Sequence, residues 1–287
     1  MYQKADAGFI DYQQYRFGSG KAVFRGPPEP IAKPYVVFLG AAQTFGRFVE
    51  LPFPKLLQQR LGMRCVNLGA AGGGPDLFLQ DEEILALCAG AEACVLQIMS
   101  GRSVSNRFYE VDGRRNAVVK SVSPELREVV AAMERNGRKL FAHDILAKIE
   151  QLKDENLTRA VFDEVRSAWV AAYVRLLANI DTHRILFWFS ERSPDSRETY
   201  SHRRSLMKFP QLVDKEMIEA VRPFSNAYVE CVTSAGMPQS LLRNGAPMLF
   251  NPSGAPKRDN PYYPSPEMHQ VAAEALCEIL GKRLTRF

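Results

Sequence analysis

Two short loops with glycine at fixed positions are the part of this sequence best suited to chemistry. The first loop runs from Gly40 to Gly46, carries Thr44, and directly follows an apolar run. The second loop runs from Asn67 to Gly72 and also follows an apolar run. Glycine permits positive φ and lets a backbone N–H approach a ligand oxygen closely, so such a loop can stabilise an oxyanion. An ordinary glycine-rich turn between strand and helix is the alternative interpretation.

Five apolar, β-rich runs alternate with helical patterns and must position these loops. Such runs are typical of strands buried on both faces of a parallel sheet. We therefore predict a three-layer α/β sandwich with a five-stranded parallel sheet, flavodoxin-like, whose loops at the carboxyl ends of the strands carry the site. The predicted strands are 35–39, 64–68, 93–98, 184–189 and 227–232, and the predicted helices are 54–61, 76–89, 123–136, 139–154, 158–180, 210–222 and 266–283.

The first loop resembles the first signature block of the SGNH (GDSL-type) hydrolases, Gly-Asp-Ser-x-Thr-x-Gly. Gly40, Thr44 and Gly46 match this block. Ala41 and Ala42 stand in place of the aspartate and the nucleophilic serine. The resemblance implies an SGNH-type fold, and it also implies that the usual nucleophile is missing.

Two further blocks of that superfamily have counterparts here. Asn67 to Gly72 matches the second block, Asn-x-Gly-x-x-Gly, and the resemblance implies that Asn67 and the Gly72 N–H donate to an oxyanion. The third block, Gly-x-Asn-Asp, has its nearest counterpart at 101–104, where Ser103 and a valine replace the two polar residues. Asn106 could supply an amide donor instead, although an ordinary loop explains this segment equally well.

The C-terminal block of the superfamily places Asp-x-x-His before a helix. Aligned with it, Asn260 takes the place of the aspartate and Tyr263 that of the catalytic histidine. His269 matches only the second, usually non-catalytic histidine, and Ser265 is placed to cap the following helix. With Ala42, all three triad positions are altered. Removing one triad member already costs roughly 10⁴–10⁶-fold in rate, so the usual esterase mechanism is disfavoured.

Three aromatic-rich segments add a second resemblance. The segments 44–48, 105–109 and 262–269 are similar to a divergent alphaproteobacterial family that lacks the usual Ser/Asp/His triad. This resemblance implies a bacterial source and no particular activity.

Two functions follow from these residues. The favoured one is recognition of a small polar, anionic or carbohydrate-type ligand by an SGNH-like protein with a degenerate triad, because no base–nucleophile pair can be assigned. The alternative is an ester hydrolase or acyltransferase with a relocated nucleophile. The predicted ligand contacts are Gln43, Asn67, Gly72, Arg102, Asn106 and Tyr263; the candidate catalytic residues are Thr44, Ser100 or Ser103 as nucleophile and His269 or Asp259 as base.

Composition limits the class of protein. A net charge of +5 over 287 residues permits an anionic ligand but is too small for a nucleic-acid interface. No apolar run reaches the roughly 20 residues of a membrane span, and the N-terminus lacks a signal-peptide pattern. Five scattered cysteines indicate reduced thiols in a cytoplasmic protein. Metal-ligand spacings, a P-loop and a dinucleotide motif are missing, so we expect no metal and no cofactor.

The sequence is expected to form one domain with additions. Residues 1–34 predict an N-terminal arm, and 35–287 a single SGNH-like α/β domain with a helical insertion at about 123–180. Apolar stripes on the inserted helices most simply pack against the sheet or each other; a homodimer contact or a roof over the site is the alternative. The basic pair at 114–115 and the basic triplet at 202–204 lie either in solvated loops or in contact with an anionic ligand.

Overall fold

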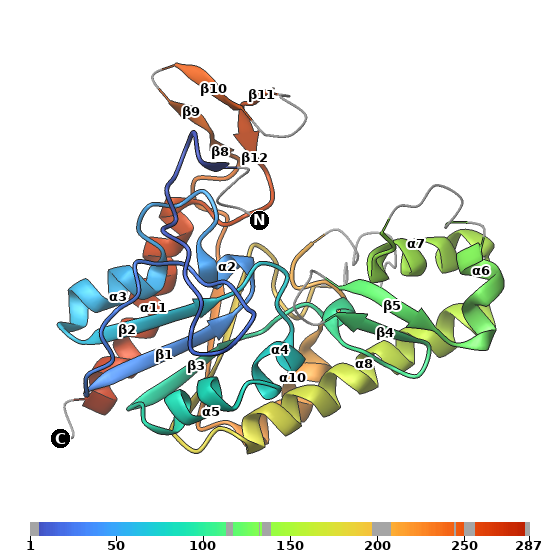
Figure 1. The fold of residues 1–287 in the computed structure, drawn as a ribbon, viewed down its shortest axis with the longest axis horizontal. Helices are drawn as coiled ribbons and strands as arrows, with labels where there is room; N and C mark the ends of the chain where they lie inside the picture. Colours follow the sequence, from blue (N-terminus) through green and yellow to red (C-terminus); the bar gives the residue numbers. More distant parts are fainter. Residues whose placement is uncertain are drawn as a thin grey trace.

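A five-stranded sheet forms the centre of the molecule. The computed structural model describes residues 6–112, 117–131, 133, 139–196, 208–243, 245–249 and 256–284. The sheet order is β2-β1-β3-β6-β7, and every neighbouring pair is parallel (Figure 1). The predicted fold class is therefore confirmed, and each predicted strand agrees to within one residue at either end. The strands are β1 (Tyr35–Gly40), β2 (Arg64–Gly69), β3 (Ala93–Gln97), β6 (Arg184–Ser190) and β7 (Ala227–Val232).

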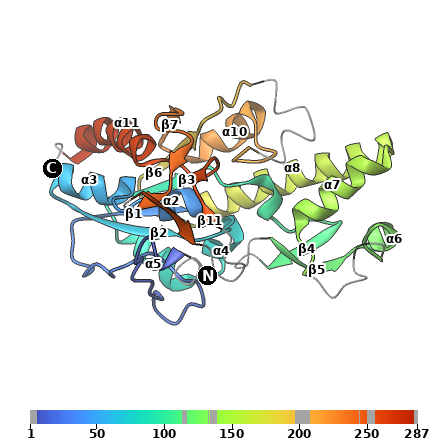
Figure 2. The ribbon, with the colours of Figure 1, turned by 90° about the horizontal axis from the view of Figure 1, so that it is seen from above.

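Helices cover both faces of this sheet because each strand is apolar on both faces. In β1, Val36 and Phe38 enter one core while Val37 and Leu39 enter the other. Figure 2 shows α3 and α11 on one side of the sheet and α5 on the other. The first core is completed by α3 (Phe53–Leu61) and α11 (Pro266–Leu284), and the second by α4 (Pro75–Leu79), α5 (Glu82–Ala89), α8 (Glu155–Ala178) and α10 (Lys215–Val221).

The predicted helix at 76–89 is two helices, because a side-chain cap starts a new helix inside it. The carboxylate of Asp81 accepts a hydrogen bond from Ile84 N and begins α5, while Asp76 lies in the first turn of α4. The helix predicted at 210–222 is shorter for the same reason, since Asp214 accepts from Met217 N and caps α10. The predicted cap of α11 is confirmed: Ser265 Oγ accepts from the N–H of Met268.

The segment between β3 and β6 holds more than the predicted helices. A hairpin of β4 (Tyr109–Asp112) and β5 (Val118–Val122) precedes α6 (Arg127–Ala131) and α7 (Ala142–Leu152). These elements share an apolar core with the first half of α8, while the second half of α8 packs on the sheet. The hairpin escaped prediction because its strands are only four and five residues long and contain the polar, exposed residues Glu110, Lys120 and Ser121.

The N-terminal segment wraps around the loop that follows β1. Arg25 donates hydrogen bonds to the carbonyl oxygens of Gly46 (2.6 Å) and Glu50 (2.8 Å), and its guanidinium lies 5.2 Å from the ring centroid of Tyr12. Tyr12 is completely buried and its hydroxyl accepts from Phe48 N. The arm therefore helps to fix the shape of the first loop.

Short antiparallel strands lead into α11, which follows the site. They are β8 (Gln239–Ser240) paired with β12 (Asp259–Asn260), and β10 (Ala246–Leu249) paired with both β9 (Leu242–Arg243) and β11 (Pro256–Lys257). None of the helices described is both long and apolar enough to cross a membrane. The basic clusters at 114–115 and 202–204 lie outside the described residues.

Candidate functional site

A cavity of about 300 Å³ lies where the loops after β1, β2, β3 and β6 meet the segment before α11. This volume is at the lower end of the range typical of small-molecule sites. The inserted helix α7 also reaches it, through His143. The lining residues are Ala41, Ala42, Gln43, Gly72, Gly73, Ser100, Arg102, Ser103, His143, Phe209, Gln211, Tyr262 and Tyr263, and we call this space the site cavity.

Four residues that line the site cavity each carry a buried polar atom with no hydrogen-bond partner among the described residues. These atoms are Gln43 Oε1, Ser100 Oγ, Gln211 Oε1 and His143 Nδ1. Gln43, Ser100 and Gln211 are only 2%, 4% and 1% exposed. An unsatisfied buried polar group costs about 1–3 kcal/mol, and nearly all such groups in proteins are paired. Their grouping around one cavity therefore points to a polar ligand.

The first loop presents a methyl group where a hydroxyl nucleophile would stand. Ala42 lines the site cavity and begins the short helix α2 (Ala42–Phe45). Gly72, from the second loop, lines the same cavity with a φ of +69°, which a residue with a β-carbon rarely adopts. The two glycine-frame loops are thus brought together, but without a reactive side chain between them.

Thr44, a predicted nucleophile, is bound into the loop beneath the site cavity. Its Oγ1 donates to Gln97 Oε1 at 2.6 Å. Gln97 Oε1 also accepts from Ala41 N at 3.0 Å. A β-carbon at Gly40 would collide with Thr44 Oγ1 and Gln97 Oε1, so glycine is required at that position. Thr44 is completely buried and is not a lining residue.

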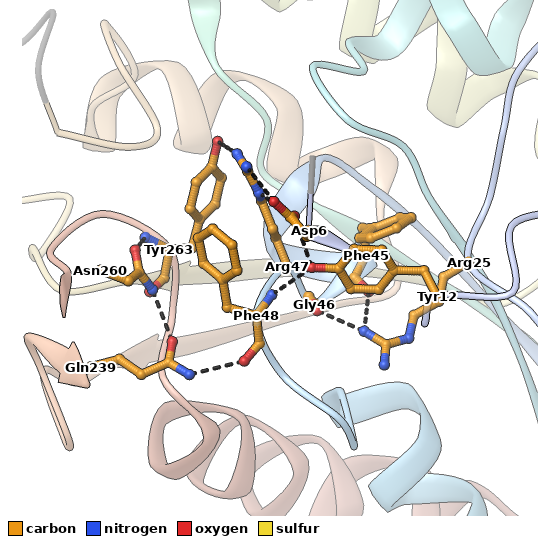
Figure 3. Close-up of polar contacts among 10 residues, drawn as sticks. All are labelled: Asp6, Tyr12, Arg25, Phe45, Gly46, Arg47, Phe48, Gln239, Asn260 and Tyr263. Carbon is orange, nitrogen blue, oxygen red and sulfur yellow. Dashed lines mark hydrogen bonds and ion pairs between the residues drawn. The ribbon is translucent and has the colours of Figure 1, made fainter. Parts of the chain in front are cut away.

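Tyr263 occupies the position aligned with the catalytic histidine, and a buried ion pair holds it there (Figure 3). Its hydroxyl accepts from Arg47 Nη1 at 3.1 Å, and the Arg47 guanidinium lies 4.9 Å from its ring centroid. Arg47 in turn donates to both carboxylate oxygens of Asp6, at 2.9 and 3.0 Å. Asp6 is completely buried and also accepts from Tyr12. The N-terminal arm therefore positions this wall of the site cavity.

Asn260, which replaces the triad aspartate, uses both ends of its amide. Its Nδ2 donates to Gln239 Oε1 (2.9 Å) and to the carbonyl oxygen of Tyr263 (2.7 Å). Its Oδ1 accepts from the N–H groups of Tyr262 and Tyr263. Gln239 is fixed by donating to the carbonyl oxygen of Phe48. Asn260 therefore shapes the turn that brings both tyrosines to the site cavity.

Two other predicted contacts lie away from the site cavity and stabilise loops. Asn67 Nδ2 donates to the carbonyl oxygen of Thr44 and its Oδ1 accepts from Gly69 N, both at 2.9 Å. Asn106 Oδ1 accepts from the N–H groups of Phe108 and Tyr109. Neither residue lines the site cavity, whereas Gln43, Gly72, Arg102, Ser103 and Tyr263 all do.

The predicted bases also lie elsewhere. His269 is completely buried against Phe53 and Phe189, and its Nδ1 accepts from Phe53 N at 3.1 Å. Burial, assisted by the charge of Arg25, lowers the pKa of His269 to about 3. The imidazole is therefore neutral and belongs to the core between the sheet and α11. Asp259 is exposed in β12 and is not a lining residue.

His143 and Gln211 are site residues that sequence reasoning missed. His143 belongs to the insertion and Gln211 follows β6 by about twenty residues, so no local spacing indicated either one. Burial lowers the pKa of His143, and the positive charge of Arg102 adds to this effect. His143 Nε2 lies 3.4 Å from Asp144 Oδ1. Gln211 Nε2 donates to the hydroxyl of Tyr262 at 2.8 Å. In the part of the chain that the structure describes, no group of three His, Cys, Asp or Glu could hold a metal ion.

A family model covers almost the whole chain. A family described as a domain of unknown function (DUF6473) matches residues 1–284. The chain belongs to this family. No curated protein matches the chain.

Several solved structures resemble this DUF6473 protein at low identity. A carbohydrate esterase family 2 enzyme of Corynascus thermopiles (Myceliophthora fergusii) has 13% identity over 91% of this chain and 69% of its own, with a TM-score of 0.42. A catalytic mutant of the acetylxylan esterase Axe2 of Geobacillus stearothermophilus has 13% identity over 87% of this chain and 95% of its own, with a TM-score of 0.40. A Desulfitobacterium hafniense protein described as a putative lipolytic protein of the G-D-S-L family has 14% identity over 86% of this chain and 99% of its own, with a TM-score of 0.37.

Stability of this DUF6473 protein should depend on pH through His269. The unfolded histidine titrates near pH 6.5, whereas the folded one stays neutral down to about pH 3, so the unfolded state binds more protons in that window. Stability is then lost as the pH falls below 6.5, by about 2 kcal/mol at pH 5 from this residue alone. Urea unfolding of the wild type and of His269→Gln at pH 7.5 and 5.0 tests this. Glutamine can still accept from Phe53 N, and the variant should show a smaller loss on acidification; an equal loss would contradict the assignment.

Restoring the triad aspartate should destabilise the protein. In Asn260→Asp, a carboxylate oxygen would face the carbonyl oxygens of Gln239 and Tyr263 in a site that is 3% exposed. An uncompensated buried charge costs roughly 3–5 kcal/mol. Asn226→Asp is the matched control, because exposed Asn226 uses only its Oδ1, which accepts from Arg184 N. Chemical unfolding at pH 7.5 should show a large loss for the first variant and little change for the second, and similar values for both would refute the prediction.

Proposed function

We propose that the site cavity binds a hydroxyl-rich ligand of the carbohydrate class and does so without acyl transfer by a Ser–His–Asp triad. The observation that carries this proposal is the set of unpartnered buried polar atoms, in which two amide oxygens stand beside a serine hydroxyl. An amide oxygen needs a hydrogen-bond donor. A carboxylate or sulfate alone offers only acceptors, whereas a ligand hydroxyl both donates and accepts and suits every one of these groups.

Aromatic side chains complete the match to such a ligand. Phe209, Tyr262 and Tyr263 line the same cavity as the two glutamines. Ring faces provide apolar area for the C–H groups of a sugar, while the amides bind its hydroxyls, which is the usual division of labour in small-molecule sites. The loss of the triad groups is consistent with binding, because Ala42 and Tyr263 leave no nucleophile–base pair at their positions.

A second candidate function is acyl transfer through a relocated nucleophile, and one observation favours it. Ser100, Ser103 and His143 line the same cavity, and Asp144 lies beside the His143 ring. The lowered pKa of His143 keeps this imidazole neutral near pH 7, as a general base requires. Ser103 or Ser100 would then attack an ester carbonyl in place of the missing serine.

Removal of one glutamine oxygen should weaken binding. A glycan array that contains neutral and acidic oligosaccharides is expected to retain the purified wild-type protein on a subset of its sugars. Gln43→Leu keeps the size of the side chain but removes both polar atoms, and loss of a hydrogen bond to a buried group should lower affinity about 5–100-fold. The matched control is Gln151→Leu on the exposed side of α7, which should bind as the wild type does. Absence of any glycan binding by the wild type would overturn the proposal.

Hydrolysis of p-nitrophenyl acetate separates the two candidates. We expect no turnover above background for the wild type, and none for Ala42→Ser, because Tyr263 cannot replace a histidine base. Turnover by the wild type that is lost both in Ser103→Ala and in His143→Gln would establish the relocated site and contradict binding alone. Circular dichroism of each variant checks that the fold is retained.

A further inference from the structure

The site cavity carries a charge that binding of a neutral sugar does not use. Arg102 is the one lysine, arginine, aspartate or glutamate among its described lining residues. Its charge contributes to lowering the pKa of His143 and opposes the rise that burial causes in the pKa of Tyr262, and both of these residues also line the cavity.

No carboxylate neutralises this charge within the described part of the chain. The ion pairs there involve other cations, and the nearby Asp144 is engaged with His143 and with Phe141 N. A cation that is partly withdrawn from water without a counter-charge favours an anion, and arginine binds carboxylate and sulfate groups with two parallel hydrogen bonds.

A smaller cavity of about 90 Å³ shares Gln43, Phe209 and Tyr262 with the site cavity. Its charged lining residues are Glu191, Arg192 and Lys208, so they carry both signs. Burial raises the pKa of the Glu191 carboxyl, although Lys208 acts against the rise. Arg102 is therefore the charge that lies on the site cavity itself, where an acidic group of the ligand would meet it.

We propose that the ligand of the site cavity is an acidic sugar, a hydroxyl-bearing ring with a carboxylate or sulfate group, and that Arg102 binds the acidic group. This inference rests on the proposed carbohydrate-class ligand and narrows it. Gln43, Ser100 and Gln211 bind the ring hydroxyls, and the acidic group lies at Arg102. Arg102 is the specificity-determining residue because the other lining residues suit neutral and acidic sugars alike.

Paired glycans test this inference. Each acidic glycan, uronate-containing or sulfated, is immobilised beside its neutral counterpart, and the dissociation constants are measured at low and at physiological salt. The wild type should bind the acidic member at least about 10-fold more tightly, and Arg102→Gln should remove that preference while neutral binding is kept. Arg102→Lys should retain part of it. Arg107→Gln changes an exposed arginine that pairs with Glu164 outside the cavity, and it should leave the preference unchanged.

The outcomes are separable. Equal binding of acidic and neutral partners, or an acidic preference that survives in Arg102→Gln, would overturn this inference and leave the proposed carbohydrate binding in place. Failure of the wild type to bind any glycan would overturn both. Preference for uronates over sulfated sugars, or the reverse, identifies which acidic group Arg102 binds.

Discussion

The hydrogen bonds of Gln97 hold together the segments that shape the site. Gln97 ends the central strand β3 and is completely buried. Its side-chain oxygen accepts from Ala41 N and Thr44 Oγ1, which fixes the loop after β1, and its carbonyl oxygen accepts from the hydroxyl of Tyr173 in α8. Tyr173 also accepts from Met99 N, directly before the loop that carries Ser100. Gln97 and Tyr173 together thus couple the loop after β1, the loop after β3 and helix α8, and both of these loops line the cavity.

Asn260 and Tyr263 each make contacts on which the native packing depends. Asn260 needs both the donor and the acceptor of its amide for the turn before α11, and an aspartate supplies only acceptors. Tyr263 is bound through Arg47 to Asp6 in the N-terminal arm. A histidine at position 263 would leave Arg47 without that hydroxyl contact. These replacements therefore support each other, and reversal of a single one disturbs contacts that the native packing uses.

The sheet could be predicted from sequence because its strands are short, largely apolar runs separated by helical patterns. The glycine frame of the first two loops also located one edge of the cavity. The direction in which individual side chains point could not be predicted from the sequence. Thr44 and Asn67 have the right types and spacing for chemistry, yet both bind backbone or buried groups. His269 enters the core between sheet and helix. His143 reaches the cavity from an insertion whose packing depends on contacts distant in sequence, so no local pattern could reveal it.

The polar atoms of the site cavity differ in kind from those of a hydrolytic site. Acyl transfer needs donors aimed at a developing oxyanion and a base beside a nucleophile. The residues that line this cavity instead include Gln43 and Gln211, whose buried amide oxygens have no donor among the described residues. An amide oxygen suits a hydroxyl donor and would repel an oxyanion. In the ligand that we propose, the acidic group uses the charge of Arg102, which hydroxyl recognition alone leaves unused. The residues around this cavity therefore support recognition as the proposal for this chain and hydrolysis as its alternative.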